Sequence, residues 1–502
     1  MNAPLLERYA DRIAGVLTCY DRIVITGTLP GACHAAGMTS FLNAHHIRIF
    51  DYPRFAEPLR DRIRANAEKL ATSAGTKIEY IAKAHVRKES IVAAVIQERG
   101  DHPGLVHVIS TMEACSSYRS WHDKRTHETF LRPTPGKCLH YYFYFIDPKL
   151  GLVYLRVPTW CPFRLQFYCN GHGWLARQLA AANIDYTMAD NAFIRIDDWD
   201  RAQQLADRLS PDVLHRVLDH YAKQCCPVLD VFGQTYHWSL MQIECSTDLA
   251  FRSEATMLPL YQAISREAIV SVKAEHVMHF LGKKMSPQLM QEVESRLSTR
   301  IEGTCIKHRL GKNSVKMYDK FGRVLRIETT TNDVSFFKHH RKVEHRDGHA
   351  SRELAAVKKS IYSLIDLREI LLGCNRRYLE FLSALDDFSA GTRSLDKLTT
   401  AKQIDGHRVK GFNFFDKTEH SLLCSLQRPE FNISGVRRAD LKPYLPHLSA
   451  SSITRYLKRL RDFGLIKKVV GTYRYYLTRI GRNAIAAACK LSEHVIIPAL
   501  AV

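Results

Sequence analysis

Alternation of polar and apolar side chains over residues 314–331 constrains the fold of this chain more than any other feature. The segment has the sequence SVKMYDKFGRVLRIETTT. Residues two apart on a strand share one side of a sheet, and a Phe-Gly pair between two alternating runs favours a turn. The segment therefore predicts a β-hairpin with one polar side and one apolar side.

The length of the turn decides which residues face each other across this hairpin. A three-residue loop, Lys320-Phe321-Gly322, places the glycine in the left-handed position of a bulged turn. A two-residue loop would bury Glu328 among aliphatic side chains, so we predict the three-residue loop. The predicted pairs are Asp319 with Arg323, Tyr318 with Val324, Lys316 with Arg326, and Ser314 with Glu328, and the apolar side holds Val315, Met317, Leu325 and Ile327.

The strand expected at residues 236–251 has a polar side of its own. Its polar residues Gln242, Glu244, Ser246 and Asp248 alternate with Met241, Ile243 and Cys245. In one sheet with the hairpin, a shared polar surface would hold the Tyr318 hydroxyl, the carboxylates of Glu244, Asp248 and Glu328, and the cations of Lys316 and Arg326. Two or three carboxylates suit Mg²⁺ or Mn²⁺, which prefer oxygen ligands and leave positions for phosphate oxygens. A tyrosine can attack a phosphodiester there once metal and cations neutralise the developing charge.

Residues 236–331 resemble the core of rolling-circle replication initiators of plasmids and phages, specifically the trans-acting type. The resemblance rests on three short motifs, Gln242-Ile-Glu-Cys-Ser-Thr-Asp248, Gly311-Lys-Asn-Ser-Val-Lys-Met-Tyr318-Asp-Lys320 and Arg326-Ile-Glu328. It implies that Tyr318 is the nucleophile of a covalent 5′-phosphotyrosine nick, and that Asp248 and Glu328 are metal ligands. The His-hydrophobic-His metal pair of most initiators in the wider superfamily has no counterpart in this sequence.

The alternative for the polar surface is a solvated ladder of salt bridges, with the tyrosine serving only as a strand residue. Residues 300–346 contain 12 Lys and Arg against 5 Asp and Glu, an excess that favours phosphate binding. Contacts to a nucleic-acid backbone are expected from Lys307, Arg309, Lys312, Lys338, His339, His340 and Arg341.

The last part of the chain has the element order of a winged helix. We expect helices at residues 420–427, 438–445 and 452–463, a wing turned at Gly471, and a final helix. Ser449 or Ser451 is expected to cap the third helix, and Gly464 to end it. The stretch SSITRYLKRLRDFGLIKKVVGTYRYYLT resembles the winged-helix module of MarR-type regulators, over about residues 419–490. In that layout the third helix enters the major groove and the wing lies on phosphates, which implies DNA contacts from Arg455, Lys458, Arg459, Arg461, Lys467, Lys468 and Arg474.

Charge and cysteine usage indicate the partner and the compartment. The 72 Lys and Arg exceed the 51 Asp and Glu by 21 charges over 502 residues, which favours a nucleic-acid partner over a merely solubilising surface. We expect DNA, although no feature of the sequence excludes RNA.

The 13 cysteines include no C-x-x-C pair, so neither a zinc ribbon nor a disulfide framework is indicated. With no signal peptide or apolar span, we expect a cytoplasmic protein without a membrane partner. The oligomeric state does not follow from these features.

The chain is expected to be an α+β protein of four parts. These are an N-terminal α/β domain of unassigned role at 1–130, a sheet-based nucleic-acid-processing domain at 135–350, a helical connector at 351–400 and the winged helix at 419–502. A helix is expected at residues 5–17, and helices on one face of an antiparallel sheet. The whole chain also resembles a bacterial family of unassigned function.

Two functions remain as hypotheses. The first is a metal-dependent DNA nicking and joining protein in a replication, mobile-element or topology role, whose winged helix selects the target. The second is a non-catalytic winged-helix regulator that binds DNA or RNA. The first requires the Tyr318 hydroxyl, whereas the second requires only the basic surfaces.

Overall fold

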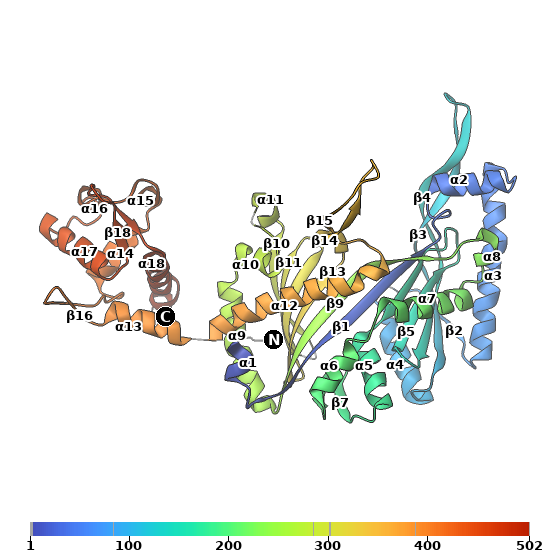
Figure 1. The fold of residues 1–502 in the computed structure, drawn as a ribbon, viewed down its shortest axis with the longest axis horizontal. Helices are drawn as coiled ribbons and strands as arrows, with labels where there is room; N and C mark the ends of the chain where they lie inside the picture. The colour runs from blue at the N-terminus through green and yellow to red at the C-terminus, as the bar shows by residue number, and fades with distance from the viewer. Residues whose placement is uncertain (1–3, 84, 285, 301–302, 387, 501–502) are drawn as a thin grey trace. The chain divides into compact units, whose positions relative to one another are not determined.

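The computed structural model describes residues 4–83, 85–284, 286–300, 303–386 and 388–500. The chain forms two compact units, Met1–Asp386 and Asp387–Val502 (Figure 1). The first unit mixes helices with one large, mostly antiparallel sheet, so the α+β expectation holds at this level. The division expected near residue 130 falls inside strand β4 of that sheet. Residues 1–386 therefore make a single unit.

Within the described residues, eleven strands form the large sheet. All neighbouring strands are antiparallel except β2 and β3. From edge to edge they are β10 (Val293–Arg300), β11 (Gly303–Leu310), β12 (Asn313–Lys320), β13 (Val324–Thr331), β9 (His237–Phe251), β1 (Ile13–Thr28), β6 (Leu165–Cys169), β5 (Gly151–Pro158), β4 (Glu128–Asp147), β3 (Gly104–Asp123) and β2 (Ile78–Tyr80).

The helix predicted at residues 5–17 is wrong for most of its length. Helix α1 covers only Pro4–Arg8, and β1 begins at Ile13. From Ile13 on, the segment pairs with β9, more than 220 residues away. Spacing within the segment could not reveal a partner so distant in the sequence. An N-terminal strand thus lies in the interior of the sheet, between β9 and β6.

Helices cover both faces of the sheet, not one face as expected. Helix α12 (Leu364–Asp386) crosses one face, where Asn375 donates from Nδ2 to the carbonyl of Cys245 and the hydroxyl of Thr247. On the opposite face, α5 (Gly171–Ala181) brings His172 to 3.5 Å from Asp248. Successive residues of β9 point to opposite faces, so the two helices enclose this part of the sheet from both sides.

The other helices of the first unit surround the sheet in Figure 1. They are α2 (Ala35–Ala44), α3 (Tyr52–Ser73), α4 (Lys88–Arg99), α6 (Trp199–Ala206), α7 (Pro211–Cys225), α8 (Leu229–Phe232), α9 (Glu254–Ser271), α10 (Ala274–Phe280) and α11 (Pro287–Met290). Two small hairpins accompany them, β7 (Tyr186–Ala189) with β8 (Ala192–Ile196), and β14 (Lys338–Glu344) with β15 (Ala350–Ala356). The connector expected to be helical from residue 351 therefore begins as a strand.

The second unit packs its helices around a core of its own. Ser449 caps α17 by accepting a hydrogen bond from the Ser452 amide at 3.1 Å, and Gly464 follows the helix with φ of +74°. The elements are α13 (Phe388–Thr399), β16 (Lys402–Ile404), β17 (His407–Val409), α14 (Lys417–Leu426), α15 (Pro429–Ser434), α16 (Arg438–Leu441), α17 (Ala450–Asp462), β18 (Ile466–Lys468), β19 (Tyr475–Leu477), α18 (Arg479–Leu491), a π-helical turn (Ser492–Ile496) and α19 (Ile497–Leu500). Among the described residues of both units, no helix has the length and apolar character needed to cross a membrane.

Candidate active site

The hairpin of β12 and β13 forms with the expected sides but a different register. Tyr318 pairs with Arg326 and Lys316 pairs with Glu328, a displacement of two residues from the predicted pairing. The loop is Phe321-Gly322-Arg323, because Phe321 and Gly322 take the positive φ values. A shift of two leaves every side chain on its predicted side.

The apolar side of the hairpin is buried as expected. Val315, Met317, Leu325 and Ile327 are at most 1% exposed and pack with residues of α9 and α12. The polar side consequently points away from α12, toward α5 and the β7–β8 hairpin.

Four neighbouring strands, β12, β13, β9 and β1, bring the polar residues together. On β13, Arg326 pairs with Asp248 of β9, and Glu328 pairs with Ser246. On β9, Glu244 pairs with Arg22 of β1. The contact between β9 and the tyrosine hairpin, on which the predicted site depended, is therefore made through β13.

Asp21 belongs to this site although the sequence did not suggest it. A β-bulge interrupts the pairing of β1 with β9 between Tyr20 and Arg22, which leaves Asp21 as the extra residue. A bulge re-aims a side chain that regular alternation would place elsewhere. Asp21 thereby joins the polar face, where its Oδ1 accepts hydrogen bonds from Asn170 at 3.3 Å and Asn191 at 2.6 Å.

Three carboxylates meet in the interior of this face. One oxygen each of Asp21, Glu244 and Glu328 lie within 4.8 Å of one another, and the three residues are at most 9% exposed. They border a cavity of about 230 Å³ whose lining also includes Arg22, Asp190, Asn191, Gly303, Cys305, Lys316, Tyr318, Asp319 and Lys320. Clustered carboxylate oxygens around a small polar cavity match the donor set that Mg²⁺ and Mn²⁺ prefer.

Neighbouring charges and burial shift the pKa values of Glu244 and Asp21 in opposite directions. The ammonium group of Lys316 donates to Glu328 and lies 3.9 Å from Glu244. Burial, followed by the nearby charge of Glu328, raises the pKa of Glu244 to about 7. Burial also opposes ionisation of Asp21, but Arg326 and His172 outweigh it and hold that pKa well below its usual range. A divalent cation would favour the ionised form of Glu244 and so lower this pKa.

Tyr318 is bound directly to the carboxylate cluster. Its hydroxyl donates to Glu328 Oε2, while Glu328 Oε1 accepts from Lys316 and, at 3.2 Å, from Thr330. Burial and the charge of Glu328 raise the pKa of Tyr318 well above its ordinary value. The phenol is therefore neutral at rest, with a carboxylate in place to accept its proton.

Arg326 and Asp248 form a buried ion pair, and the metal role expected for Asp248 stays a prediction. Arg326 donates from Nε and Nη2 to the two oxygens of Asp248 at 2.7 and 2.6 Å. It also donates to the Asn191 carbonyl at 2.8 Å, and its side chain is wholly buried. Asp248 therefore holds the guanidinium in place, and the third carboxylate that lies within 4.8 Å of Glu244 and Glu328 is that of Asp21.

One nitrogen of the Arg326 guanidinium, Nη1, is not used in these hydrogen bonds. Nη1 has no hydrogen-bond partner and lies 3.6 Å from Asp21 Oδ1. The guanidinium also sits 5.9 Å from the centre of the Tyr318 ring. It therefore adds positive charge between the tyrosine and the acidic cluster.

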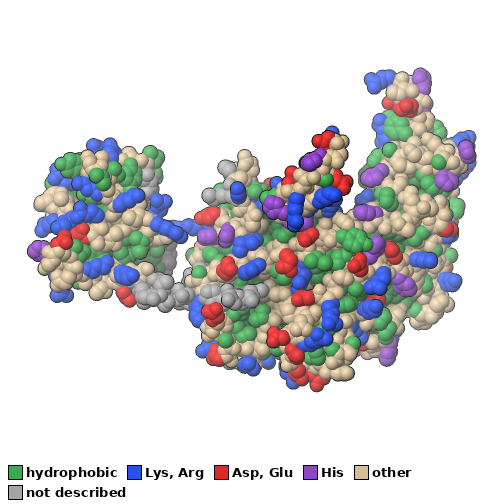
Figure 2. Space-filling model, in the orientation of Figure 1, with side chains coloured by type: hydrophobic (Ala, Val, Ile, Leu, Met, Phe, Trp, Pro, Cys, Tyr) green, Lys and Arg blue, Asp and Glu red, His purple; other side chains and the backbone are tan. Residues whose placement is uncertain are grey.

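The cations expected to contact nucleic acid in the first unit divide by exposure. Lys307 pairs with Lys316 in register and is half-buried, on the site's side of the sheet. Arg309, Lys312, Lys338 and His340 are exposed, and Figure 2 shows Lys, Arg and His side chains over the β14–β15 hairpin. His339 and Arg341 are half-buried; Arg341 donates from Nε to the Ala356 carbonyl at 2.9 Å.

In the second unit, most of the expected contacts are exposed on α17 and the β18–β19 hairpin. These are Arg455, Lys458, Arg461, Lys467 and Lys468. Arg459 differs, because it forms an ion pair with buried Glu419 at 2.7 Å and lies over the Phe412 ring. Arg474 is half-buried and donates to the Ser434 carbonyl. Arg459 thus stabilises the unit internally and is not available as a groove contact.

Comparison with known proteins gives no relative for this chain. No protein-family model, no curated protein and no solved structure matches it significantly.

Proposed function

We propose that this protein nicks and rejoins DNA in a metal-dependent reaction, with Tyr318 as the nucleophile. The observation that carries the proposal is the hydrogen bond from the Tyr318 hydroxyl to Glu328, a member of the buried cluster with Asp21 and Glu244. A nucleophile, a proton acceptor and a set of oxygen ligands therefore border one cavity. Mg²⁺ or Mn²⁺ bound by the three carboxylates would neutralise charge that develops on the phosphate.

The chain's own residues supply the remaining parts of the reaction. The Tyr318 oxygen forms a bond to phosphorus, and its proton passes to Glu328 Oε2. The bond from phosphorus to the 3′ oxygen breaks, and that oxygen takes a proton from solvent. In the joining step the 3′ hydroxyl attacks the phosphotyrosine and loses its proton to solvent, and Tyr318 recovers its proton from Glu328.

Positive charge surrounds the reacting group. Lys316 and Arg326 flank Tyr318 on the same side of the hairpin, and Arg22 lines the cavity. The three carboxylates repel a phosphate, and the positive charges of these side chains offset that repulsion. Asp248 holds Arg326 in place by a two-oxygen ion pair, so it is a positioning residue.

The second unit supports a role in target selection. Exposed cations lie on α17 and on the hairpin that follows it, the order found in a winged helix. We propose that α17 enters the major groove and that Lys467 and Lys468 contact phosphates. The exposed cations of the β14–β15 hairpin would add backbone contacts in the first unit.

A second candidate is a DNA- or RNA-binding regulator without catalysis. It is favoured by the position of Lys316, whose ammonium group already acts as a counter-ion for Glu328 and Glu244. In that case the cluster is an internal ion-pair network and the basic surfaces perform the function.

An experiment that detects a covalent adduct between protein and DNA distinguishes the two candidate functions. Purified protein is incubated with supercoiled plasmid and with labelled single strands, in Mg²⁺, Mn²⁺ or EDTA, and analysed on denaturing gels. We expect nicked plasmid and label attached to protein only with the metal. Both are expected to be lost in Tyr318→Phe and in Asp21→Asn, while DNA binding is retained.

Tyr168→Phe is the matched control. Tyr168 lies on β6 under the guanidinium of Arg22, but it does not line the cavity of the three carboxylates. This variant should form the adduct as the wild type does. Salt-sensitive DNA binding with no adduct from the wild type, over varied strands and both metals, would support the regulator instead.

A further inference from the structure

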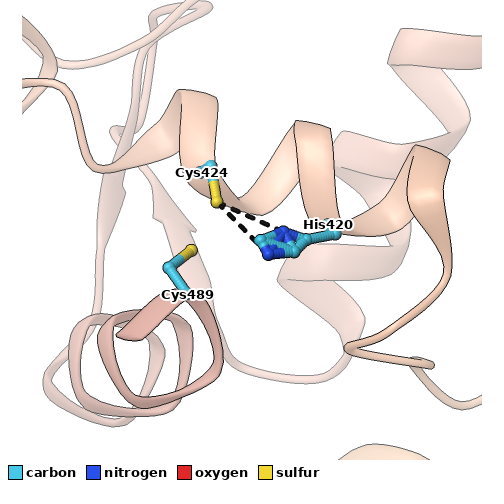
Figure 3. Close-up of side chains that lie close together, drawn as sticks. All are labelled: His420, Cys424 and Cys489. Carbon is cyan, nitrogen blue, oxygen red and sulfur yellow. Dashed lines mark hydrogen bonds between the residues drawn. The ribbon is translucent and has the colours of Figure 1, made fainter. Parts of the chain in front are cut away.

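His420, Cys424 and Cys489 meet in the second unit, far from the carboxylate cluster in the chain. Their ligand atoms lie within 4.8 Å of one another. Cys424 Sγ is 3.4 Å from His420 Nδ1 and 3.8 Å from Nε2. Figure 3 shows the Cys489 side chain pointing toward the other two.

The positions of these residues follow from two packed helices. His420 and Cys424 are four residues apart on α14, so they share one face of that helix. Cys489 lies on α18 among residues that pack against α14 in the core of the unit. Two helices that are fixed by an apolar core therefore hold the three side chains together, as a preformed set.

The spacing of Cys424 and His420 suits two ligands of one tetrahedral zinc ion. Zinc binds thiolate sulfur at about 2.3 Å and imidazole nitrogen at about 2.0 Å, which separates two such ligands by about 3.5 Å. Cys424 Sγ lies 3.4 Å from His420 Nδ1, the nearer ring nitrogen, which is close to this value. Soft thiolates combined with imidazole select zinc over magnesium, manganese or calcium.

A fourth ligand is available on the turn after α18. Glu493 is four residues beyond Cys489 and is exposed. Four residues are about one helical turn, so Glu493 follows Cys489 on about the same face of the helix, and a bound cation would offset the repulsion between three negative ligands.

We propose that His420, Cys424 and Cys489 bind a zinc ion, with Glu493 or a water molecule as the fourth ligand. The ion joins α14, which precedes α17 in the chain, to α18, which follows it. It is a structural site that fixes the helices around α17, and it does not depend on the chemistry proposed for Tyr318.

Metal content of the full-length protein tests this site. Protein purified under reducing conditions without chelator should contain about one zinc ion per chain by mass spectrometry of the metal. Cobalt replacement should give the charge-transfer absorption of thiolate bound to tetrahedral Co²⁺, which a carboxylate site cannot produce. Cys424→Ser and Cys489→Ser should each lose the zinc and that absorption.

Two further variants distinguish the removal of a zinc ligand from a loss of zinc that is caused by misfolding. Cys33→Ser removes another half-buried thiol and should keep the zinc. His420→Cys replaces the imidazole by a third thiolate, and it should keep the metal with stronger charge-transfer absorption. Absence of zinc from the wild type, a disulfide between Cys424 and Cys489, or full cobalt absorption in the folded Cys424→Ser protein would each overturn the assignment.

Discussion

Lys316 occupies the position of a counter-ion inside the sheet. Its side chain is 16% exposed and its ammonium group is held between Glu328 and Glu244. Lys316→Met should lower the free energy of unfolding by roughly 3–5 kcal/mol in EDTA, because buried carboxylates lose their cation. Added Mn²⁺ should restore much of this loss if the carboxylates bind metal, as urea titrations with and without the ion would show.

Lys320→Met is the control for this substitution. Lys320 lies on the same strand and side, but its partner Asp190 is 61% exposed. A pair so open to solvent contributes only about 0–1 kcal/mol. Equal destabilisation of the two variants, or no response of the Lys316 variant to Mn²⁺, would contradict the prediction.

His308 should make the first unit sensitive to acid. It is 1% exposed, with Ser295 at 2.8 Å from Nδ1 and Tyr378 at 3.0 Å from Nε2. Burial lowers its pKa from 6.5 to about 4. The unfolded chain therefore binds the proton first, and stability is lost as pH falls from about 6.5 to about 4, by about 3 kcal/mol.

Unfolding titrations of the wild type and of His308→Gln test this pH dependence. The glutamine side chain keeps hydrogen-bonding capacity but does not titrate between pH 4 and 7. The difference in unfolding free energy between the two proteins should change by about 3 kcal/mol over that interval. A constant difference would show that His308 titrates normally in the folded protein.

Several site residues could be named from the sequence, and others could not. Alternation alone placed Tyr318, Lys316, Arg326 and Glu328 on one side of the hairpin. Asp21 was missed because its position depends on a bulge that exists only when β1 pairs with β9. Asp248 was predicted as a metal ligand from the resemblance and from its polar side of the strand, but alternation does not give the nearest neighbour of a residue. The neighbour, Arg326, is fixed by strand register.

Neighbouring cations on helix α17 have different surroundings, although the sequence pattern predicts DNA contacts for both. Lys458 is exposed, whereas Arg459 is paired with Glu419, whose side chain is 5% exposed. Lys458→Glu should weaken duplex DNA binding about tenfold and lower the salt slope of binding by roughly one, since a phosphate contact is lost. Binding measured across a range of salt concentrations checks both values.

Arg459→Met should act on stability and not on binding. It leaves Glu419 buried without its cation, at an expected cost of about 3 kcal/mol in unfolding free energy. DNA affinity of the folded variant should stay near that of the wild type. Weak binding by a fully stable Arg459→Met protein would show that this side chain reaches the DNA.

The bounds of α17 were predictable because their signals are local, whereas the helix predicted at 438–445 ends at Leu441. Ser449 and Gly464 enclose α17 within a few residues of sequence. The hairpin loop of β12 and β13 was displaced because Phe321, and not only Gly322, takes a positive φ. That conformation is uncommon for a phenylalanine, so the sequence favoured the glycine as the end of the loop.

At the scale of the whole molecule, the two compact units predict separable activities. All residues of the carboxylate cluster and Tyr318 lie before Asp386, and α17 lies after it. A chain ended after Asp386 should keep metal-dependent adduct formation on single strands. Its affinity for duplex DNA should fall about tenfold or more. Undiminished duplex binding by this shorter chain would remove the second unit from target selection.

The interior position of β1 also bears on how the chain is made. Residues 13–28 are synthesised well before their partner strands β6 and β9, which end at residues 169 and 251. Until residue 169 is made, the strand that carries Asp21 has no completed neighbour, and its other edge stays unpaired until β9 ends at residue 251. Contacts between residues so far apart in sequence form slowly and leave strand edges open to aggregation. We therefore expect newly made chains to depend on chaperones until β9 is complete, and the carboxylate cluster to assemble after β1 has been inserted.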